Sequence, residues 1–242
     1  MKLIIYLLLL NLFTITSFAQ TYNVRIHSGG GTAFSQTTGI DSITFDVSTN
    51  FTCGDNIFWG SDAYPTVLIG NQCWFAKNLN IGTRINADQN QNNNGIIEKY
   101  CYDNVERNCV TYGGLYQWDE AMQYSTTPGA KGICPPGWHI PTFAEFQALR
   151  DAVGNDGNAL KAVGQGTDPG AGTNTSGFSA LLAGSRSFNG NFANFGNFAY
   201  FWSSAEITAN NAFSLSLTNN GSSISLSNLN KNHGFSVRCV KD

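Results

Sequence analysis

The stretch Cys134-Pro-Pro-Gly-Trp-His-Ile-Pro-Thr142 leads directly into a helical pattern over residues 143–153, and the rest of the chain is organised around this junction. Its three prolines cannot lie inside a helix, so the segment before Thr142 is predicted to be extended or turned. The Thr142 hydroxyl can accept a free backbone N–H at the start of the helix, and Glu145 completes a capping box. The buried side of this helix is expected to carry three apolar residues at helical spacing, Phe146, Leu149 and Val153.

Four segments of the chain resemble a known domain family. They are CPPGWHIPTFAEFQAL (134–149), GFSALLAG (177–184), YFWSSAE (200–206) and the closing GFSVRCVKD (234–242). Together they closely resemble the Fibrobacter succinogenes major paralogous domain, which is similar to the C-type-lectin-like and formylglycine-generating-enzyme folds. The resemblance runs from about Cys53 to Asp242. It implies a lectin-like α+β domain of short helices and antiparallel strands, with the first and last segments at its two ends.

The composition favours one globular domain without a charged binding face. The chain has 242 residues, of which 42% are hydrophobic, enough to fill a core, and only 12% are charged. The 13 lysine and arginine residues are outnumbered by 16 aspartate and glutamate residues, and neither sign forms a cluster. A nucleic acid is therefore not expected as a partner.

Residues 1–19 have the pattern of a signal peptide. Lys2 precedes an apolar run over Leu3–Leu12, and Ser17-Phe-Ala19 matches a small-x-small signal, so cleavage is predicted after Ala19. A retained anchor is the alternative, but this run is shorter than the ~20 apolar residues that span a bilayer. No later run is long enough to span a membrane. The mature protein is expected to be secreted or on the cell surface, with the periplasm as an alternative.

Residues 20–50 are predicted to form a small β-hairpin leader ahead of a main domain over residues 51–242. An alternating strand is expected over Tyr22–His27, followed by a glycine turn, and a later strand is expected over Ile40–Phe45. The segment resembles the short hairpin leaders found ahead of many exported Bacteroidetes domains. It is too small to have a core of its own.

The pattern of the main domain favours many strands and a few helices, without the regular alternation that marks a parallel sheet. Strands are predicted at Asn56–Trp59, Thr66–Gly70, Phe178–Leu182 and Tyr200–Trp202, and helices at Tyr112–Tyr124 and Asn158–Val163. Asn220-Gly221 is the strongest hairpin signal in the chain, and it lies in a meander of alternating apolar residues. The predicted fold class is therefore α+β.

Six cysteines lie after the predicted cleavage site: Cys53, Cys73, Cys101, Cys109, Cys134 and Cys239. An even number in an exported protein predicts three disulfides, and sequence alone leaves all 15 pairings open. The order of the cysteines, together with the lectin-like resemblance, favours 53–73, 101–109 and 134–239. A zinc site is not favoured, because the cysteines and histidines lack metal-binding spacing.

The sequence contains no recognisable catalytic centre. Formylglycine-generating enzymes depend on a pair of cysteines near the end of their domain, whereas this region contains only Cys239. His139 and His233 have no acidic residue at a fixed spacing, so packed or hydrogen-bonded histidines are expected there. Asp119 and Glu120 are adjacent in a predicted helix and would point about 100° apart. A non-enzymatic protein without cofactors is expected.

The Asn-rich stretch over residues 86–95 partly imitates a calcium-binding loop. Oxygen-bearing side chains occupy its first odd positions, counted from Asp88. An EF-hand loop also needs Gly at its sixth position and a bidentate Glu at its twelfth. These positions carry Asn93 and Lys99, with Glu98 one place early. A solvated loop without calcium is therefore expected.

The hypothesis that remains is an exported, non-enzymatic binding or structural module, with a glycan or a cell-surface protein as its partner. A calcium-dependent lectin and a catalytic relative of the formylglycine-generating enzymes are the alternatives. The usual lectin site needs several carboxylates late in the domain, and Glu206 and Asp242 are the only acids after Ser203. That site is therefore not expected.

The candidate binding surface is the loop Ser185–Asn197, because lectin-like folds have a long loop between their central strands. One interpretation places phenylalanine rings outside as stacking platforms, with asparagines that contact a polar ligand. The residues concerned are Phe192, Phe195, Asn191, Asn194 and Asn197. The alternative packs the rings in a small satellite core beneath the loop.

Overall fold

The computed structural model describes residues 23–28, 31–36 and 51–242, and the chain divides into two compact units, Met1–Asn50 and Phe51–Asp242. In the first unit, β1 (Asn23–Ser28) pairs with β2 (Gly31–Gln36) as an antiparallel hairpin. The predicted signal peptide and the strand predicted at Ile40–Phe45 lie outside the described residues. None of the helices in the described part of the chain is long and apolar enough to cross a membrane.

The second unit contains twelve strands and five short helical segments. The strands are β3 (Asn56–Trp59), β4 (Asp62–Ile69), β5 (Gln72–Phe75), β6 (Thr83–Arg84), β7 (Glu98–Lys99), β8 (Trp138–His139), β9 (Ser185–Arg186), β10 (Phe192–Ala193), β11 (Phe198–Thr208), β12 (Asn211–Thr218), β13 (Ser225–Asn230) and β14 (Val240–Lys241). The helices are η1 (Tyr102–Asn104), α2 (Glu106–Tyr112), α3 (Trp118–Ala121), α4 (Phe143–Ala152) and α5 (Gly157–Leu160).

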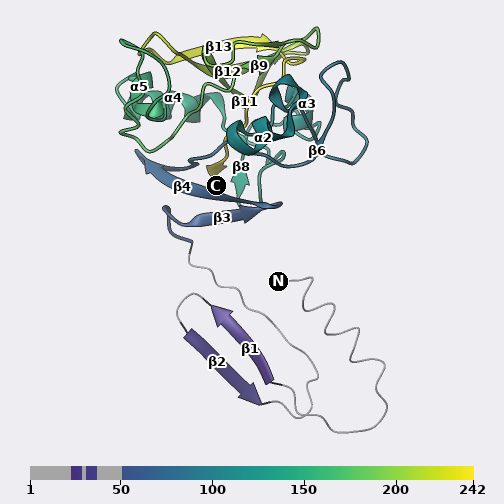
Figure 1. Cartoon of the computed structure of the whole chain (residues 1–242), viewed down its shortest axis with the longest axis vertical. Helices are drawn as coiled ribbons and strands as arrows, with labels where there is room; N and C mark the ends of the chain where they lie inside the picture. The colour runs from purple at the N-terminus through teal and green to yellow at the C-terminus, as the bar shows by residue number, and fades with distance from the viewer. Residues whose placement is uncertain (1–22, 29–30, 37–50) are drawn as a thin grey trace. The chain divides into compact units, whose positions relative to one another are not determined.

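Two antiparallel sheets form the frame of this unit (Figure 1). One has the strand order β3-β4-β5-β14-β8, and the other has the order β11-β12-β13. Two small pairs complete it: β9 and β10 are antiparallel, whereas β6 and β7 are parallel. A strand-rich unit with a few short helices confirms the predicted α+β class.

The two stretches that were expected at the ends of the domain meet in the five-stranded sheet. β14 pairs with β8, with Val240 opposite His139 and Lys241 opposite Trp138. The disulfide between Cys134 and Cys239 joins the same segments, with a Cα–Cα distance of 5.9 Å.

The remaining cysteines pair as Cys53–Cys73 and Cys101–Cys109. The connectivity therefore agrees with the predicted one, and no free cysteine remains in residues 51–242.

Helix α4 begins at the predicted capping box. The Thr142 hydroxyl accepts the Glu145 N–H at 3.2 Å, and the Glu145 carboxylate accepts the Thr142 N–H at 2.7 Å. Phe146 and Leu149 are fully buried in a core shared with both sheets. Figure 1 shows α4 and α5 between the three-stranded sheet and β4. Helix α4 therefore packs in the space between the two sheets.

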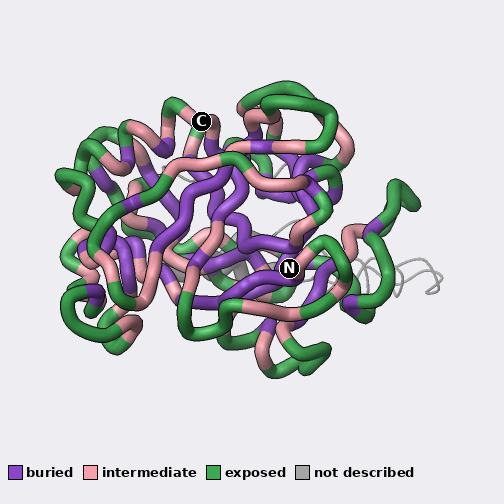
Figure 2. Tube along the Cα trace, turned by 90° about the horizontal axis from the view of Figure 1, so that it is seen from above, coloured by how far each residue is buried: buried purple, intermediate pink, exposed green. Residues whose placement is uncertain are grey.

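The unit contains two apolar cores. One surrounds Trp118, Trp138 and Trp202, and the other surrounds Trp74 and Phe178. Figure 2 shows that buried residues follow the central segments, while the exposed residues lie mainly in the peripheral loops. The two cores supply most of the apolar burial that stabilises the unit.

The strand predicted at Phe178–Leu182 is wrong. Ser179 has a φ of 56°, which interrupts an extended strand, and only Ala180 forms an isolated bridge, to Lys161. The buried Arg238 donates to the Ser179 carbonyl at 3.0 Å and to the Phe178 carbonyl, so these acceptors are not available to a sheet. Burial lowers the pKa of Arg238 to about 9. Because this pKa is still above neutral pH, the guanidinium stays charged.

The helix predicted at Tyr112–Tyr124 is also wrong in its extent. Two short helices, α2 and α3, lie on either side of an extended segment in which Tyr116 exchanges two backbone hydrogen bonds with Phe235. These long-range bonds replace the local bonds that a helix would make. Helix α2 was not predicted, and the second predicted helix, at Asn158–Val163, is shorter than expected because α5 ends at Leu160.

Candidate functional site

A groove of about 270 Å³ lies where the β9–β10 hairpin, the three-stranded sheet and the closing segment meet. We call it the serine–aromatic groove, because serine hydroxyls and aromatic rings supply most of its lining. The lining residues are Ser185, Ser187, Ala193, Asn194, Phe198, Tyr200, Ser216, Ser227, Leu229, His233 and Phe235. None of these is Asp, Glu, Lys or Arg, so the lining carries no carboxylate, ammonium or guanidinium group.

An aromatic ladder runs along the groove. The rings of Phe198 and Tyr200 stack with centroids 5.4 Å apart, and Tyr200 stacks on Phe235 at 4.7 Å. His233 continues the series on Phe235 at 5.5 Å, and all three pairs are within 15° of parallel. The rings hold one another at fixed spacing through offset stacking.

Strand register places polar groups beside this ladder. Tyr200 lies opposite Ser216 across β11 and β12, and directly opposed residues of an antiparallel pair share one face of the sheet. Ser214 lies opposite Ser227 across β12 and β13. The other face of the sheet carries leucines of the second core, such as Leu215. Alternation along the strands therefore separates a leucine face in the second core from a face on which serines lie beside Tyr200 and Trp202, next to the first core.

Two of the serines that line the groove are largely buried residues. Ser185 is 4% exposed and Ser216 is 8% exposed. Behind them, Ser214 is 1% exposed, and its Oγ has no hydrogen-bond partner in the described part of the chain. Buried hydroxyls are normally hydrogen-bonded, so the Ser214 hydroxyl, which does not line the groove itself, is an unsatisfied polar group beside it.

Tyr200 adds a directional donor to the same site. The Asn194 side-chain amide donates to the Tyr200 hydroxyl at 3.2 Å, so that oxygen already acts as an acceptor. Burial raises the pKa of Tyr200, although the hydrogen bond from Asn194 opposes this change. The phenol therefore stays protonated at neutral pH and can donate to a ligand oxygen.

Arg186 fixes the wall of the groove. Its side chain is 2% exposed and donates to the carbonyls of Ala87, Gln89 and Asn232 at 2.6 to 3.2 Å. Its guanidinium also lies over the Tyr100 ring, 4.8 Å from the centroid. Arg186 thus ties the hairpin to the Asn-rich stretch and to the closing segment.

The predicted binding loop Ser185–Asn197 is a short hairpin, and its predicted site residues separate into two groups. Asn194 lines the groove. Phe192 and Phe195 pack instead on Tyr102, with centroid distances of 5.0 and 4.6 Å, and do not line it.

Two further predicted residues take part in hydrogen bonds of the fold. The Asn191 carbonyl accepts the Ser187 N–H at 2.7 Å. The Asn197 side chain accepts from Asn219 at 2.9 Å. A binding role for these residues and for the two phenylalanines stays a prediction.

The family model named Fibrobacter succinogenes major domain matches residues 67–241 of the chain. The chain belongs to this family. The matched region includes every residue that lines the serine–aromatic groove. No curated protein and no solved structure matches the chain.

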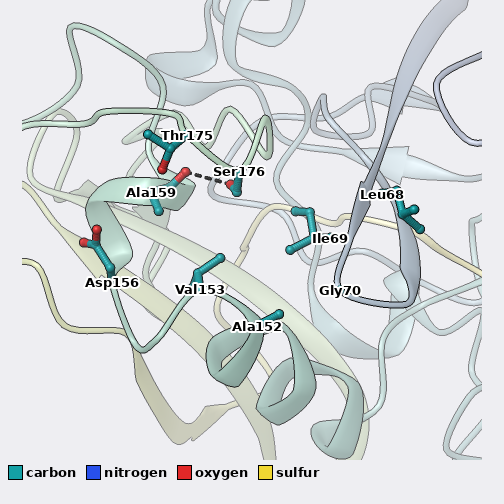
Figure 3. A pocket seen from close by; sticks show the side chains of 9 residues that line it. All are labelled: Leu68, Ile69, Gly70, Ala152, Val153, Asp156, Ala159, Thr175 and Ser176. Atoms are coloured by element: carbon teal, nitrogen blue, oxygen red, sulfur yellow. Dashed lines mark hydrogen bonds between the residues drawn. The ribbon is translucent and has the colours of Figure 1, made fainter.

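The Fibrobacter succinogenes major domain also has a second hollow, of about 400 Å³, between the β4–β5 turn and the ends of α4 and α5 (Figure 3). Its walls are formed mainly by small or aliphatic residues such as Ile69 and Val153. Two of its polar side chains are already used: Ser176 donates to the Ala159 carbonyl at 2.7 Å, and Asp156 accepts the Asn158 N–H at 2.9 Å. The groove therefore offers more unpaired polar groups than this hollow.

Ionisable groups of the Fibrobacter succinogenes major domain form internal pairs. The His139 ring lies between the carboxylates of Glu145 and Asp242, at 2.9 and 2.6 Å. Asp119 faces Lys231 at 3.9 Å, whereas Glu120 accepts the Glu98 N–H at 2.9 Å, so these adjacent acids do not share a site. Among the described residues, no group of three or more His, Cys, Asp or Glu side chains is arranged to hold a metal ion.

The Asn-rich stretch is closed by its own hydrogen bonds. The Glu98 carboxylate accepts from the Asn92 backbone at 3.0 Å and from the Asn94 side chain at 3.1 Å. Arg186 binds the carbonyls of Ala87 and Gln89 in the same stretch. A buried guanidinium therefore supplies the positive charge that these oxygens face.

Proposed function

We propose that this chain is an exported, non-enzymatic binding module of lectin-like fold, and that its serine–aromatic groove binds a glycan. The observation that carries the proposal is an uncharged groove in which four serine side chains lie beside an aromatic ladder. Glycans present many hydroxyl groups that both donate and accept hydrogen bonds, and serine hydroxyls do the same. A lining with a few polar groups among apolar rings is typical of small-ligand sites.

The arrangement of the ionisable groups supports a non-catalytic role. Both ring nitrogens of His139 face carboxylates, and Cys239 is held in a disulfide, so neither has the free geometry of a base or a nucleophile. Arg186 supports binding without calcium, because it takes the carbonyl oxygens of the stretch that most resembles a calcium loop.

Two observations support export. Three disulfides within one domain favour an oxidising compartment. The first 19 residues have the pattern of a signal peptide. The lectin-like fold is supported by the sequence resemblance and by the way β14, at the end of the domain, pairs with β8 and with β5 near its start.

The proposal is tested with the full chain on an array of neutral and acidic glycans, followed by calorimetric titration of a bound glycan. Replacing Ser216 with Ala (Ser216→Ala) removes one hydroxyl from the groove and is expected to weaken binding by about 1 kcal/mol, or about fivefold. Ser185→Ala should have a similar effect. Binding is expected to persist in a chelator, which a calcium-dependent lectin would not show.

The matched control is Ser222→Ala, which changes an exposed serine between β12 and β13 that does not line the groove. It should bind as wild type does. If a glycan binds but both groove variants retain full affinity, the groove is not the binding surface. If the array captures no glycan and the chain binds only a deglycosylated surface protein, the alternative partner is correct.

A further inference from the structure

Phe188 extends the aromatic ladder beyond the groove lining. Its side chain is 64% exposed, and its ring meets the His233 ring edge-to-face at a centroid distance of 5.7 Å. Phe188 lies in the turn of the β9–β10 hairpin, which is closed by a 2.7 Å backbone hydrogen bond from Ser187 to Asn191. The turn therefore places a large apolar ring in solvent at one end of the ladder, where a ligand can reach it.

The opposite end of the ladder is Phe198, the first residue of β11. It is half-buried, and its ring stacks on Tyr200. Between the two ends lie Tyr200, Phe235 and His233, and successive centroids along the ladder are 4.7 to 5.7 Å apart. Phe198 lines the groove, and Phe188 is exposed beside it. The site is therefore several rings long, with a phenylalanine ring at each end.

The groups between these platforms are polar but uncharged. Ser185, Ser216 and Ser227 line this part of the groove with hydroxyls. Burial lowers the pKa of His233, although a hydrogen bond with the Arg186 backbone opposes this change, so the imidazole is neutral at pH 7. An acidic or basic ligand would gain no opposite charge from this lining, which favours a neutral one.

We infer that the groove takes an extended, neutral saccharide chain, with one sugar ring on Phe198, another on Phe188 and the sugars between them hydrogen-bonded to the groove serines. This inference rests on the proposed function, and it adds the length and charge of the ligand. A single sugar ring can reach only one of the two platforms. Binding should therefore depend on chain length.

The test is calorimetric titration of the full chain with neutral homo-oligosaccharides of glucose, mannose and xylose, from the monosaccharide to the hexasaccharide. We expect the affinity for the best series to rise at least tenfold with length and then level off. Phe188→Ala should weaken hexasaccharide binding about tenfold, the effect of losing one buried ring contact, and leave monosaccharide binding unchanged. Because Phe188 is exposed, this variant is expected to fold normally.

The matched control is Phe58→Ala, which removes a phenylalanine that is 80% exposed on β3, in the other sheet. It should leave the affinity for every chain length unchanged. Equal affinity for short and long chains, or a Phe188→Ala variant that binds the hexasaccharide as wild type does, overturns the extended site and leaves glycan binding in place. Failure to bind any saccharide overturns the proposed function as well.

Discussion

His139 links the start of α4 to the end of the chain through the carboxylates of Glu145 and Asp242. Burial disfavours its imidazolium, but hydrogen bonds to Glu145 and Asp242 outweigh this effect and raise the pKa of His139. The carboxyl of Glu145 shows the converse: burial opposes ionisation, and hydrogen bonds from His139 and Thr142 lower its pKa. At pH values between the lowered pKa of Glu145 and the raised pKa of His139, both groups are therefore charged and form an ion pair.

Removing His139 should change stability in a pH-dependent way. Because the pKa of His139 is higher in the folded than in the unfolded state, its contribution to stability is fully present at pH values below the unfolded pKa of about 6.5. The contribution is lost as the pH rises through the folded-state pKa. We expect His139→Ala to lower the free energy of unfolding by about 1 kcal/mol more near pH 6 than near pH 9. Urea denaturation across this range measures the difference.

His233 provides a control of opposite sign. Its pKa is lowered, chiefly by burial, so its contribution is present above the unfolded pKa and is lost as pH falls through the folded pKa. The difference in the free energy of unfolding between wild type and His233→Ala should therefore be larger at high pH than at low pH. A His139→Ala difference that does not change with pH would contradict the assigned bridge.

At the level of elements, the β9–β10 hairpin is held on η1 and α2 by aromatic packing. Phe195 contacts Tyr102 and Tyr112 with centroid distances of 4.6 and 4.8 Å, and it is 38% exposed. Phe192 contacts Tyr102 and is half-buried. These contacts match the satellite packing that was one of the two interpretations of this loop.

Phe192→Ala and Phe195→Ala are each expected to lower the free energy of unfolding by about 1–2 kcal/mol, less than the ~3 kcal/mol or more of a fully buried ring. Urea denaturation gives the stability change, and titration with the glycan selected on the array gives the affinity. Variants with normal stability and weakened glycan binding would show that these rings act as stacking platforms instead.

At the scale of the whole molecule, the Cys134–Cys239 disulfide closes a segment with a sequence separation of 105 residues. Loop entropy predicts that opening it costs up to about 4.7 kcal/mol. The double variant Cys134→Ser/Cys239→Ser should therefore be the least stable of the three disulfide variants, as measured by thermal and urea unfolding.

The disulfide between Cys101 and Cys109 is the matched comparison, because its sequence separation is only 8. The corresponding Cys101→Ser/Cys109→Ser variant should lose about 2.5 kcal/mol by the same loop-entropy relation. An equal loss for the short and long loops would show that the long disulfide does not act mainly by closing the chain.

Local signals in the sequence were sufficient for several elements. The capping box at Thr142 and Glu145 defined the start of α4, because it depends on groups only three residues apart. Strand β3 lies where Asn56–Trp59 was predicted, and Asn220-Gly221 lies in the connection between β12 and β13. The α+β class followed from the same short-range patterns.

Where the local sequence patterns failed, hydrogen bonds between residues far apart in the sequence determined the structure. Arg238 takes the carbonyls of residues 178 and 179, and Phe235 pairs with Tyr116, so neither predicted element could form as expected. Sequence contains little information about such partners, because they lie more than 50 residues apart and compete with local hydrogen bonding.

By itself, the sequence determined the fold class, the family and the presence of six cysteines, whose pairing in chain order the family resemblance favoured and the structure shows. Of the candidate groove, it indicated only the region around Asn194. Alternation along β11 and β12 could have identified Tyr200 and Ser216 as one face, but not what covers each face. The tertiary structure decided that, because only packing shows that the leucine face meets α4 in the second core while the face with Tyr200 and Ser216 borders the first core and the groove.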